Sequence, residues 1–525
     1  MSLDEFLNNL HVDKGMASPS DWEVNWEDGP LPYKLYRGLP VIPFSLEVPL
    51  TLEGQGAILK RDLSTIGHFL WYVFGLTQIS ESVFPFNSTE QAVDLIHSFR
   101  RFVPSGGALY PNELYVYLKL ENSPAGVYHY DAAHHQLVML REGNFDSYIT
   151  RALGNRCDVS TCFGTVFVST MFWKNFFKYH NFAYRLQGLD TGVVIGQLLE
   201  VSKQFGFAAG VYFQFLDRAI NHLLGLSEQE ESVYAVIPLS ENTTDLFTNG
   251  CDIEEISTAT ELCQELTAIQ TNHYVRSRRI IEYPMITKMN EASMLESTQS
   301  LWKMKAKESI NFEGQAVTLP HVKRLSYDLA SICRKRFSPD MDFVLGKISQ
   351  MQLATLLQEA TASFSYLNDI DEAQEKHASR VSLYGCLYNV EDIPNGAYFY
   401  NSTAHELRAV YLGDHRLRLQ YGLSGDNVNL LQVPLCLHVG GDMDHFKTQL
   451  GYRGYRIQQM EAGMLVQRLL LVASAIGMGG HPLLGYNTNL CDEIYKMESQ
   501  GKTSLIKIPI GHYRNRPWLR GSLHS

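Results

Sequence analysis

The chain has 525 residues, of which 45% are apolar and 19% are charged, and its formal net charge at pH 7 is −12. This length predicts two or three globular domains, and the negative charge argues against a nucleic-acid partner bound through phosphate contacts. No apolar run reaches membrane-spanning length, and no secretory signal opens the chain. The eight scattered cysteines form no Cys-x-x-Cys pair, so we expect reduced thiols, no metal site and a cytoplasmic protein.

Proline, glycine and capping residues mark the bounds of the first predicted elements. Residues 1–25 are polar, and we expect them to be loosely ordered. Prolines exclude a helix from 30–43. Helical spacing of apolar residues then predicts a helix over 63–76, with Ser64 as its N-cap and Gly75 near its end.

The most informative stretch is Pro104-Ser105-Gly106-Gly107-Ala108-Leu109-Tyr110-Pro111. It follows Arg100-Arg101 and precedes an alternating, aromatic run that predicts a strand over 113–120. Glycines let backbone N–H groups approach a flat or anionic ligand, and a serine adds a donor. Arginines bind phosphate through planar, charge-assisted bonds. The turn is therefore a candidate ligand site, and a plain loop with two solvated arginines is the alternative.

Regular elements continue to the middle of the chain. Two strands over 124–131 and 136–140 read as a hairpin, and a buried strand is predicted over 165–170. A long helix over roughly 186–205 is predicted to end at Gly206.

The second half of the chain repeats the first. At an offset of 271 residues, Tyr184-Arg185 matches Tyr455-Arg456, and further positions of the following helix match without a gap. At an offset of 270 residues, the Pro-x-Gly-x-Tyr-x-Tyr run beginning at Pro124 recurs at Pro394. We infer two copies of one α+β unit. The predicted organisation is a flexible N-terminus at 1–25, a first domain at 26–270, a connecting segment at 271–330 and a second domain at 331–525.

Two arginines recur in both copies, which indicates a structural role. Arg185 and Arg456 are matched by the offset of 271, and each is followed closely by an acid. We expect Arg185 to pair with Asp190 and Arg456 to pair with Glu461.

The run Arg-x-x-Pro-Ser-Gly-Gly-Ala-Leu-Tyr-Pro, followed by an aromatic strand, resembles the signature of SagB-type (ThcOx-type) dehydrogenases. These are FMN enzymes of the nitroreductase fold, and many oxidise thiazolines and oxazolines in peptides to thiazoles and oxazoles. The resemblance implies an α+β chain of two tandem nitroreductase-like domains that form an intramolecular pseudo-dimer. In such dimers FMN lies at the subunit interface. One subunit supplies arginines and flavin-edge backbone, and the other supplies the Pro-Ser turn.

Under this resemblance the two halves are complementary. The first half has the turn, and the second half has basic or glycine-rich stretches at 334–338, 477–482 and 511–516. One composite site is expected to be complete and the other degenerate, so we predict one FMN per chain. For the arginines, a solvated basic surface is the alternative. The FMN-binding residues implied are Arg101, Pro104, Ser105, Gly106, Gly107, Arg334, Arg336, Ser338, Gly479, Gly480, Arg514 and Arg516.

Lys178-Tyr179 resembles the catalytic pair that SagB-type dehydrogenases use near the substrate. The offset of 271 gives Gln449-Leu450 in the second half, which cannot move a proton, so one active site is expected. Burial lowers the pKa of a lysine enough for it to accept a proton. A surface lysine beside a packed tyrosine is the alternative. His180 departs from the family, in which glycine often follows the tyrosine.

The resemblance implies a dehydrogenase that acts on a heterocyclised peptide and is reoxidised by oxygen, with cyclodehydratase subunits as partners. Other readings stay open: a nitro- or quinone reductase, an oxidase of carrier-bound amino acids, or a flavin-free scaffold subunit. Little chain precedes the first predicted helix, so we expect no N-terminal peptide-clamp domain of the cyanobactin type. The substrate, the kind of azole and the oligomeric state, including a homodimer, are not determined by the sequence.

Overall fold

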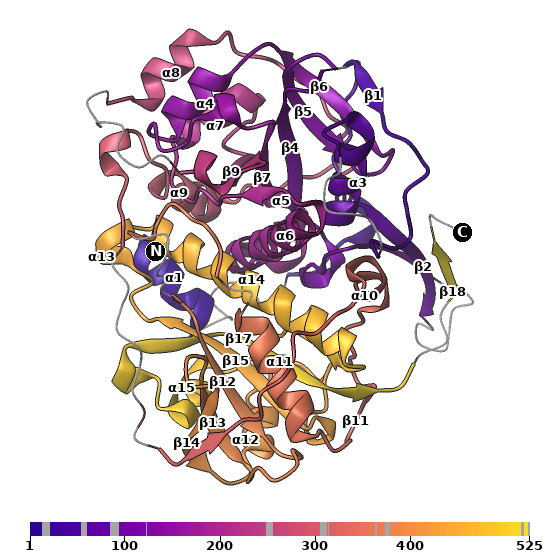
Figure 1. Ribbon diagram of the computed structural model, residues 1–525, viewed down its shortest axis with the longest axis vertical. Coiled ribbons are helices and arrows are strands. Elements are labelled where there is room, and N and C mark those ends of the chain that lie inside the picture. The colour runs from indigo at the N-terminus through magenta and orange to yellow at the C-terminus, as the bar shows by residue number, and fades with distance from the viewer. Residues whose placement is uncertain are drawn as a thin grey trace.

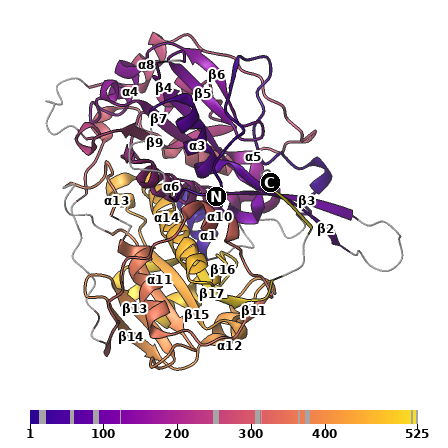
Figure 2. The same cartoon turned by 45° about the vertical axis from the view of Figure 1, so that its right-hand side comes forward.

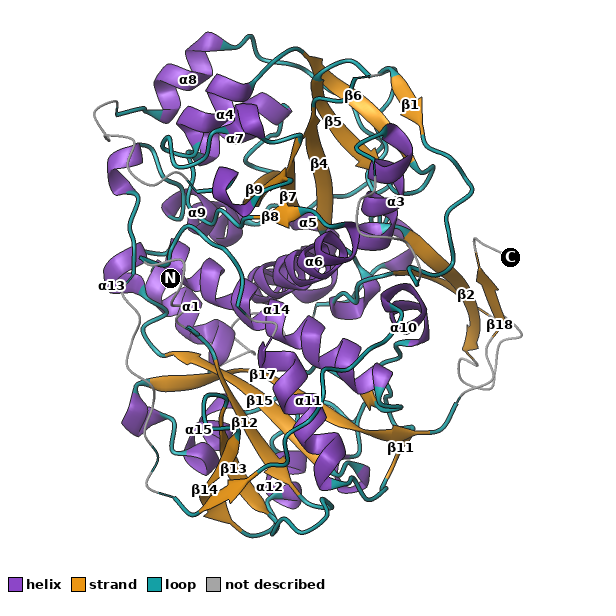
Figure 3. Cartoon of the chain, in the orientation of Figure 1, coloured by secondary structure: helices purple, strands orange, loops and turns teal. Residues whose placement is uncertain are grey.

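The computed structural model describes residues 1–12, 22–53, 60–84, 94–121, 123–247, 256–304, 312, 314–362, 365–372, 379–515 and 519–522. The first and second halves of the chain form separate sheets with helices around them, and two long helices lie between these sheets (Figure 1). These helices are α6 (Ala183–Phe205) and α14 (Arg453–Ala475). Figure 3 shows the resulting arrangement, in which helical segments separate the strands of one half from those of the other.

The two large sheets have the same order of central strands. The first runs β1-β6-β5-β4-β7-β9-β8, and the second runs β10-β14-β13-β12-β15-β17-β11, with β16 beside β17. All neighbouring strands are antiparallel. In the first sheet the strands are β1 (Val41–Pro43), β4 (Asn112–Leu118), β5 (Gly126–Asp131), β6 (Gln136–Glu142), β7 (Gly164–Met171), β8 (Ala208–Ala209) and β9 (Glu231–Ser240). In the second they are β10 (Ala316–Thr318), β11 (Phe343–Val344), β12 (Ser382–Leu387), β13 (Gly396–Asn401), β14 (Glu406–Leu412), β15 (Leu435–Asp442), β16 (Gly479–Gly480) and β17 (Lys502–Tyr513).

The expected strands and long helices are present with small shifts at their ends. The helix after the prolines is α3 (Leu63–Phe74), and its N-cap is Asp62, whose carboxylate accepts from the Thr65 N–H, so the expected cap at Ser64 is wrong. Helix α6 ends at Gly206 in the left-handed conformation, as the glycine predicts. The other α-helices are α1 (Leu3–His11), α4 (Asp146–Ala152), α5 (Phe172–Tyr179), α7 (Asp217–Leu224), α8 (Ala259–Glu265), α9 (Pro284–Ala292), α10 (Leu329–Lys335), α11 (Gln350–Ala362), α12 (Arg416–Tyr421), α13 (Lys447–Leu450) and α15 (Thr488–Tyr495).

Repeated sequence positions take the same local structure in both halves. In the first hairpin, His135 has a φ of 50° and its Nδ1 lies 3.0 Å from the Tyr130 hydroxyl. In the second hairpin, His405 has a φ of 49° and its Nδ1 lies 2.8 Å from the Tyr400 hydroxyl. The offset seen in the sequence therefore corresponds to a repeated turn with the same side-chain hydrogen bond.

Two matched glycines mark the crossing of α6 and α14. A Cβ atom at Gly192 would overlap the backbone carbonyl of Met460, and one at Gly463 would overlap that of Leu189. Only glycine therefore allows this close approach. The two helices also serve both cores, since Val193 of α6 packs in the first core and Leu189 in the second.

Two expected boundaries differ from the structure. Residues 1–25 are not uniformly loose, because Leu3–His11 form α1, with a capping box between Ser2 and Glu5 and with Phe6 and Leu10 in the core. The segment 271–330 is more than a linker, since it contains α9, and its strand β10 pairs with β14 of the second sheet. Apolar contacts anchor both segments where charge and polarity suggested mobility.

A third, small sheet projects from the body of the molecule (Figure 2). It consists of the hairpin β2 (Leu76–Phe84) and β3 (Asp94–Arg101) together with β18 (Leu519–Ser522), which pairs with β2. The end of the second half thus adds a strand to an element of the first half. Across the described residues, we find no helix with the length and apolar character needed to span a membrane.

Candidate functional site

A cavity of about 810 Å³ lies between the two halves, and both contribute to its wall. The first half supplies the turn at 104–108 and side chains of α5 and α6, and the second half supplies residues near 336–340, 424–427 and 481–485. The predicted site residues that line this cavity are Pro104, Ser105, Gly106, Gly107, Lys178, Tyr179, Arg336 and Ser338.

The glycine-rich turn donates hydrogen bonds to a carboxylate of α6. The Ser105 hydroxyl donates to Asp190 at 2.6 Å, and the Gly106 N–H donates to the same carboxylate at 3.1 Å. The Ser105 oxygen also accepts from the Tyr110 N–H at 3.0 Å. Gly107 has a φ of 66°, which a glycine adopts without steric cost. Asp190 therefore fixes the shape of a turn that the sequence recognised only by its glycines.

Lys178 and Tyr179, at the end of α5, lie directly against this turn. A Cβ atom at Gly107 would lie 2.5 Å from the Tyr179 hydroxyl and 3.1 Å from the Lys178 Nζ. Burial lowers the pKa of Lys178, whereas burial, assisted by the charge of Asp190, raises the pKa of Tyr179. The Lys178 ammonium position lies 5.2 Å from the ring centre of Trp26. The pair thus combines a lysine that loses its proton more readily than a solvated lysine with a tyrosine that keeps its own.

The residue after this pair has an unusual backbone. His180 has φ 48° and ψ −139°, and Gly451, its counterpart at the offset of 271, has φ 58° and ψ −151°. A side chain disfavours this region, which explains why glycine suits the position. The ring of His180 stacks near Phe176 and Trp22, at centroid distances of 4.6 and 5.3 Å. The histidine therefore holds a strained turn directly beside the candidate catalytic pair.

On the opposite wall, Arg336 is almost fully buried, with 5% of its surface exposed. Its Nη1 donates to the Ser338 hydroxyl at 3.3 Å, and its backbone carbonyl accepts from the guanidinium of Arg100. Its Nε has no hydrogen-bond partner in the described part of the chain. Burial, together with the nearby charge of Arg100, lowers the pKa of Arg336 to about 10. Two arginines close to each other in one cavity favour an anionic ligand.

The neighbouring arginines of β3 point to opposite sides, as strand geometry requires. Arg100 lines the cavity, although the sequence suggested Arg101. Arg101 is fully buried, and its guanidinium donates to the carbonyls of Phe74 at 2.8 Å and Pro32 at 2.7 Å. Alternation along β3 separates the two side chains, but only the fold shows which side is the cavity.

The other expected flavin ligands do not line the cavity. Arg334 donates to the Leu50 carbonyl. A Cβ atom would lie 2.5 Å from Pro339 at Gly479 and 2.6 Å from Leu470 at Gly480, so packing accounts for both glycines. Arg514 is exposed and its N–H bonds the Asp342 carbonyl, and Arg516 lies outside the described residues. Several residues that the sequence reasoning did not select as ligands also line the cavity. They include Arg100, Asp190, Ser424, Asn427 and His481.

Neither of the expected arginine–acid pairs forms. Arg185 donates to the backbone carbonyls of Leu10, at 3.0 Å, and of Leu505. Arg456 forms an ion pair with Asp217, with 3.1 Å between Nη2 and Oδ1. The recurrence of these arginines indicated a structural role correctly, but their partners come from parts of the chain that no local spacing identifies.

Two positions that match the cavity wall at the offset of 271 contact protein groups in the other half. Glu461, the counterpart of Asp190, forms an ion pair with Arg380 at 2.6 Å, and Arg380 also pairs with Asp371 at 2.5 Å. The N–H of Val211, whose counterpart Pro482 lines the cavity, bonds the Leu367 carbonyl at 2.9 Å. The two halves therefore differ in the partners of these matched positions.

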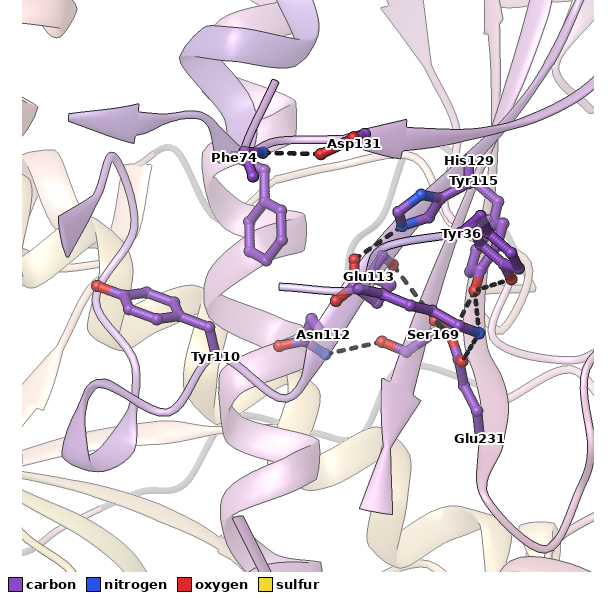
Figure 4. Close-up of polar contacts among 12 residues, drawn as sticks. Tyr36, Phe74, Tyr110, Asn112, Glu113, Tyr115, His129, Asp131, Ser169 and Glu231 are labelled. Carbon is purple, nitrogen blue, oxygen red and sulfur yellow. Dashed lines mark hydrogen bonds and ion pairs between the residues drawn. The ribbon is translucent and has the colours of Figure 1, made fainter. Parts of the chain in front are cut away.

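A buried charged network supports the turn from the first sheet (Figure 4). The ammonium group of Lys174 contacts the carboxylate of Glu113 and donates to the Tyr110 carbonyl at 3.2 Å. Glu113 also lies 2.9 Å from His129. Burial alone would raise the pKa of Glu113, but the charges and hydrogen bonds of Lys174 and His129 outweigh it and lower the pKa. A similar pair joins Lys34 to Glu231 at 2.7 Å. These pairs hold β4, the strand that follows the turn, in place.

Known proteins resemble this chain in part. The model of the nitroreductase family matches residues 85–239. A crystal structure from Anabaena variabilis, assigned as a nitroreductase, superposes with a TM-score of 0.74 and covers 98% of this chain and 99% of its own, at 19% identity. This likeness shows the α+β nitroreductase-like fold, and it assigns no substrate.

Two further matches cover smaller parts of this chain. The trifolitoxin-processing protein TfxB of Rhizobium leguminosarum bv. trifolii is 30% identical over 142 residues, which is 25% of this chain. The match spans only 37% of the length of that relative. A chain from the Escherichia coli microcin synthetase complex McbBCD is similar over 40% of this chain and 79% of its own, at 18% identity and a TM-score of 0.29, a value at which no conclusion follows.

Proposed function

We propose that this protein is an FMN-dependent dehydrogenase that oxidises thiazoline or oxazoline rings of a peptide to thiazoles or oxazoles. One observation carries the proposal: the turn at 104–107, the pair Lys178-Tyr179 and the Arg336–Ser338 segment of the second half all line the same cavity. In this proposal the two halves are tandem nitroreductase-like domains that form a pseudo-dimer within one chain. The matching strand orders and the crossing of α6 with α14 support that arrangement.

The charged groups and the apolar wall of the cavity support FMN as its ligand. Arg100 and Arg336 provide cationic groups for a phosphate, and the unpartnered Nε of Arg336 has a donor to offer. The apolar wall suits a flat ring system, and its aliphatic members are Leu186, Leu189, Val193, Val466 and Ile506. FMN, when bound, accepts a hydride. We propose Arg336, Ser338 and Arg100 as its phosphate-side ligands and the backbone at 104–107 as a ligand of its ring.

The oxidation of an azoline to an azole removes a hydride and a proton from adjacent ring atoms. We propose that the neutral amine of Lys178 accepts the proton at Nζ, because burial favours its uncharged form. Tyr179, whose raised pKa keeps its hydroxyl protonated, donates a hydrogen bond that orients the substrate ring. The close approach of both groups to Gly107 brings base and ring binding site together. In this scheme the proton leaves through Lys178 and oxygen reoxidises the cofactor.

A peptide substrate is supported by the partial likeness to the trifolitoxin-processing protein. Together with the resemblance of the turn to SagB-type dehydrogenases, it favours a precursor peptide over a free nitroaromatic compound. Cyclodehydratase subunits, which make azolines, are the partners that this chemistry requires. We also propose one FMN per chain, because Glu461, the counterpart of Asp190, is paired with Arg380 and not with a glycine-rich turn.

The test begins with the visible spectrum and the released flavin of the purified full-length chain. We expect one FMN per chain and the loss of two hydrogens from an azoline-containing peptide under air without NAD(P)H. Oxidation of NAD(P)H with nitro reduction, and no change in the peptide, would favour the nitroreductase alternative. Protein that stays colourless after soaking in FMN would leave only the scaffold alternative.

A further inference from the structure

Asp190 is a buried carboxylate in the cavity wall whose hydrogen bonds are all with the turn. Only 6% of its surface is exposed, and its partners are the Ser105 hydroxyl at 2.6 Å and the Gly106 N–H at 3.1 Å. Among the described residues, no lysine, arginine or histidine lies within ion-pair distance of it. Its counterpart Glu461 is instead neutralised by Arg380 at 2.6 Å. One copy of this acid is thus paired with a cation and the other is not.

The contacts of Asp190 determine what Ser105 can offer to a ligand. A serine hydroxyl has one hydrogen and two lone pairs. The hydrogen is directed to Asp190 and one lone pair accepts from the Tyr110 N–H, so Ser105 can present only a lone pair to the cavity. When Asp190 is protonated, its carboxyl group can donate to the Ser105 oxygen, and the serine hydrogen is then free to turn toward the cavity.

We propose that Asp190 is a positioning residue whose protonation state sets whether Ser105 accepts from, or donates to, the ligand in the cavity. This inference rests on the proposed function in taking that ligand to be FMN. Asp190 does not touch the ligand in this scheme, because it acts through Ser105 and Gly106.

The surroundings of Asp190 place its change of protonation state in a pH range that experiments can reach. Burial raises the pKa of Asp190 to about 6, although the hydrogen bonds from Ser105 and Gly106 oppose the shift. The other titratable groups of the cavity are Lys178 and Tyr179 from α5, Arg100 from β3, Tyr110 from the turn, and Arg336, Asp340 and His481 from the second half. Burial lowers the pKa of His481, which disfavours the charged form of this ring. Tyr179 stays protonated there because its pKa is raised.

The test is the affinity of the full-length chain for added FMN, measured by flavin fluorescence across the range in which Asp190 titrates. The phosphate of FMN titrates at about pH 6 as well. The measured quantity is therefore the ratio of the Kd of the wild type to the Kd of Asp190→Asn, in which the phosphate contribution cancels. We expect this ratio to change by about threefold to tenfold between about pH 5 and about pH 7.5, the effect of one hydrogen bond gained or lost.

Ser105→Ala is the second variant, because it retains the acid and removes the group through which the acid acts. Its Kd should show the same pH dependence as that of Asp190→Asn, and it carries the test if Asp190→Asn does not fold. A ratio that stays constant across this range, or a Ser105→Ala profile identical to the wild type, would overturn the inference while FMN binding itself stands. A wild type that binds no FMN at any pH would overturn the proposed function and this inference together.

Discussion

At the residue scale, burial distinguishes Lys178 from a common surface lysine. Its spacing in the sequence is equally compatible with a solvated lysine beside a packed tyrosine. In the structure its amine lies in the cavity wall, near Gly107 and the ring of Trp26, and burial lowers its pKa. No carboxylate acts on this pKa to oppose that shift.

Replacing Lys178 by methionine keeps the length of the side chain and removes the amine. We expect azoline oxidation to fall by about a hundredfold to ten-thousandfold, the usual contribution of a general base, with the flavin content unchanged. In the wild type the rate should rise with pH as Lys178 deprotonates, and this rise should begin at a lower pH than for a solvated lysine because the pKa is lowered. Rates measured against pH test both expectations.

The matched control is Lys203→Met, at an exposed lysine of α6 that pairs with Glu200. It should leave both the rate and its pH profile unchanged. A Lys178→Met protein that retains its rate and profile would exclude this residue as the base.

At the element scale, strands and turns explain which side chains reach the cavity. Arg100 and Arg101 are equivalent in composition, but alternation along β3 sends one to the cavity and the other to carbonyl groups of the core. The turn at 104–108 depends similarly on its glycines, because Tyr179 and Lys178 occupy the space where a side chain of Gly107 would lie.

We expect Gly107→Ala to separate the turn from the candidate base. The new methyl group would lie 2.5 Å from the Tyr179 hydroxyl, so the lysine–tyrosine pair must move. The kcat for azoline oxidation should fall by about tenfold or more, since catalysis is sensitive to displacements of this size. Steady-state kinetics and denaturant unfolding of the same samples separate this effect from a loss of stability.

Gly477→Ala is the control for backbone strain. Gly477 also has a positive φ, of 78°, but no atom lies near its Cβ position. Both variants should lose about 1 kcal/mol of stability, and only Gly107→Ala should lose activity. Equal activity in the two variants would argue against close packing of the pair on the turn.

At the scale of the whole molecule, the two copies of the repeat have similar backbones, but their matched charged side chains make different contacts. The matched glycines Gly192 and Gly463 let α6 and α14 cross closely. The matched acids differ, because Asp190 accepts a hydrogen bond from Ser105 whereas Glu461 forms an ion pair with Arg380. Around Glu461, a network of Arg380, Asp371 and the Tyr366 hydroxyl fills the protein interior.

We expect Arg380→Ala to destabilise the protein strongly. It leaves the buried carboxylates of Glu461 and Asp371 without their cation, a change that costs about 3–5 kcal/mol. Denaturant unfolding, followed by fluorescence, measures the loss. The control is Arg418→Ala, which removes an exposed ion pair with Glu493 and should cost about 1 kcal/mol or less. Similar losses in the two variants would mean that the network contributes little to stability.

Local patterns in the sequence predicted much of the architecture. Apolar periodicity located α3, α6 and the central strands to within a few residues, and glycine marked the ends of helices. The offset of 271 located matching glycines whose backbones meet in the structure. These features depend on short-range sterics and spacing, which the chain carries locally. In the candidate site, the glycines drew attention to the turn, and the resemblance to SagB-type dehydrogenases implied Lys178-Tyr179, Arg336 and Ser338, which line the same cavity.

Only the tertiary structure decided which charged groups meet. It directed Arg100 rather than Arg101 to the cavity, gave Asp190 to the turn rather than to Arg185, and paired Glu461 with Arg380. It also used Gly479 and Gly480 for packing. Each of these outcomes depends on contacts between residues far apart in the chain. A buried charge takes whichever partner the fold brings within reach, because leaving it unpaired costs more than forming any particular pair.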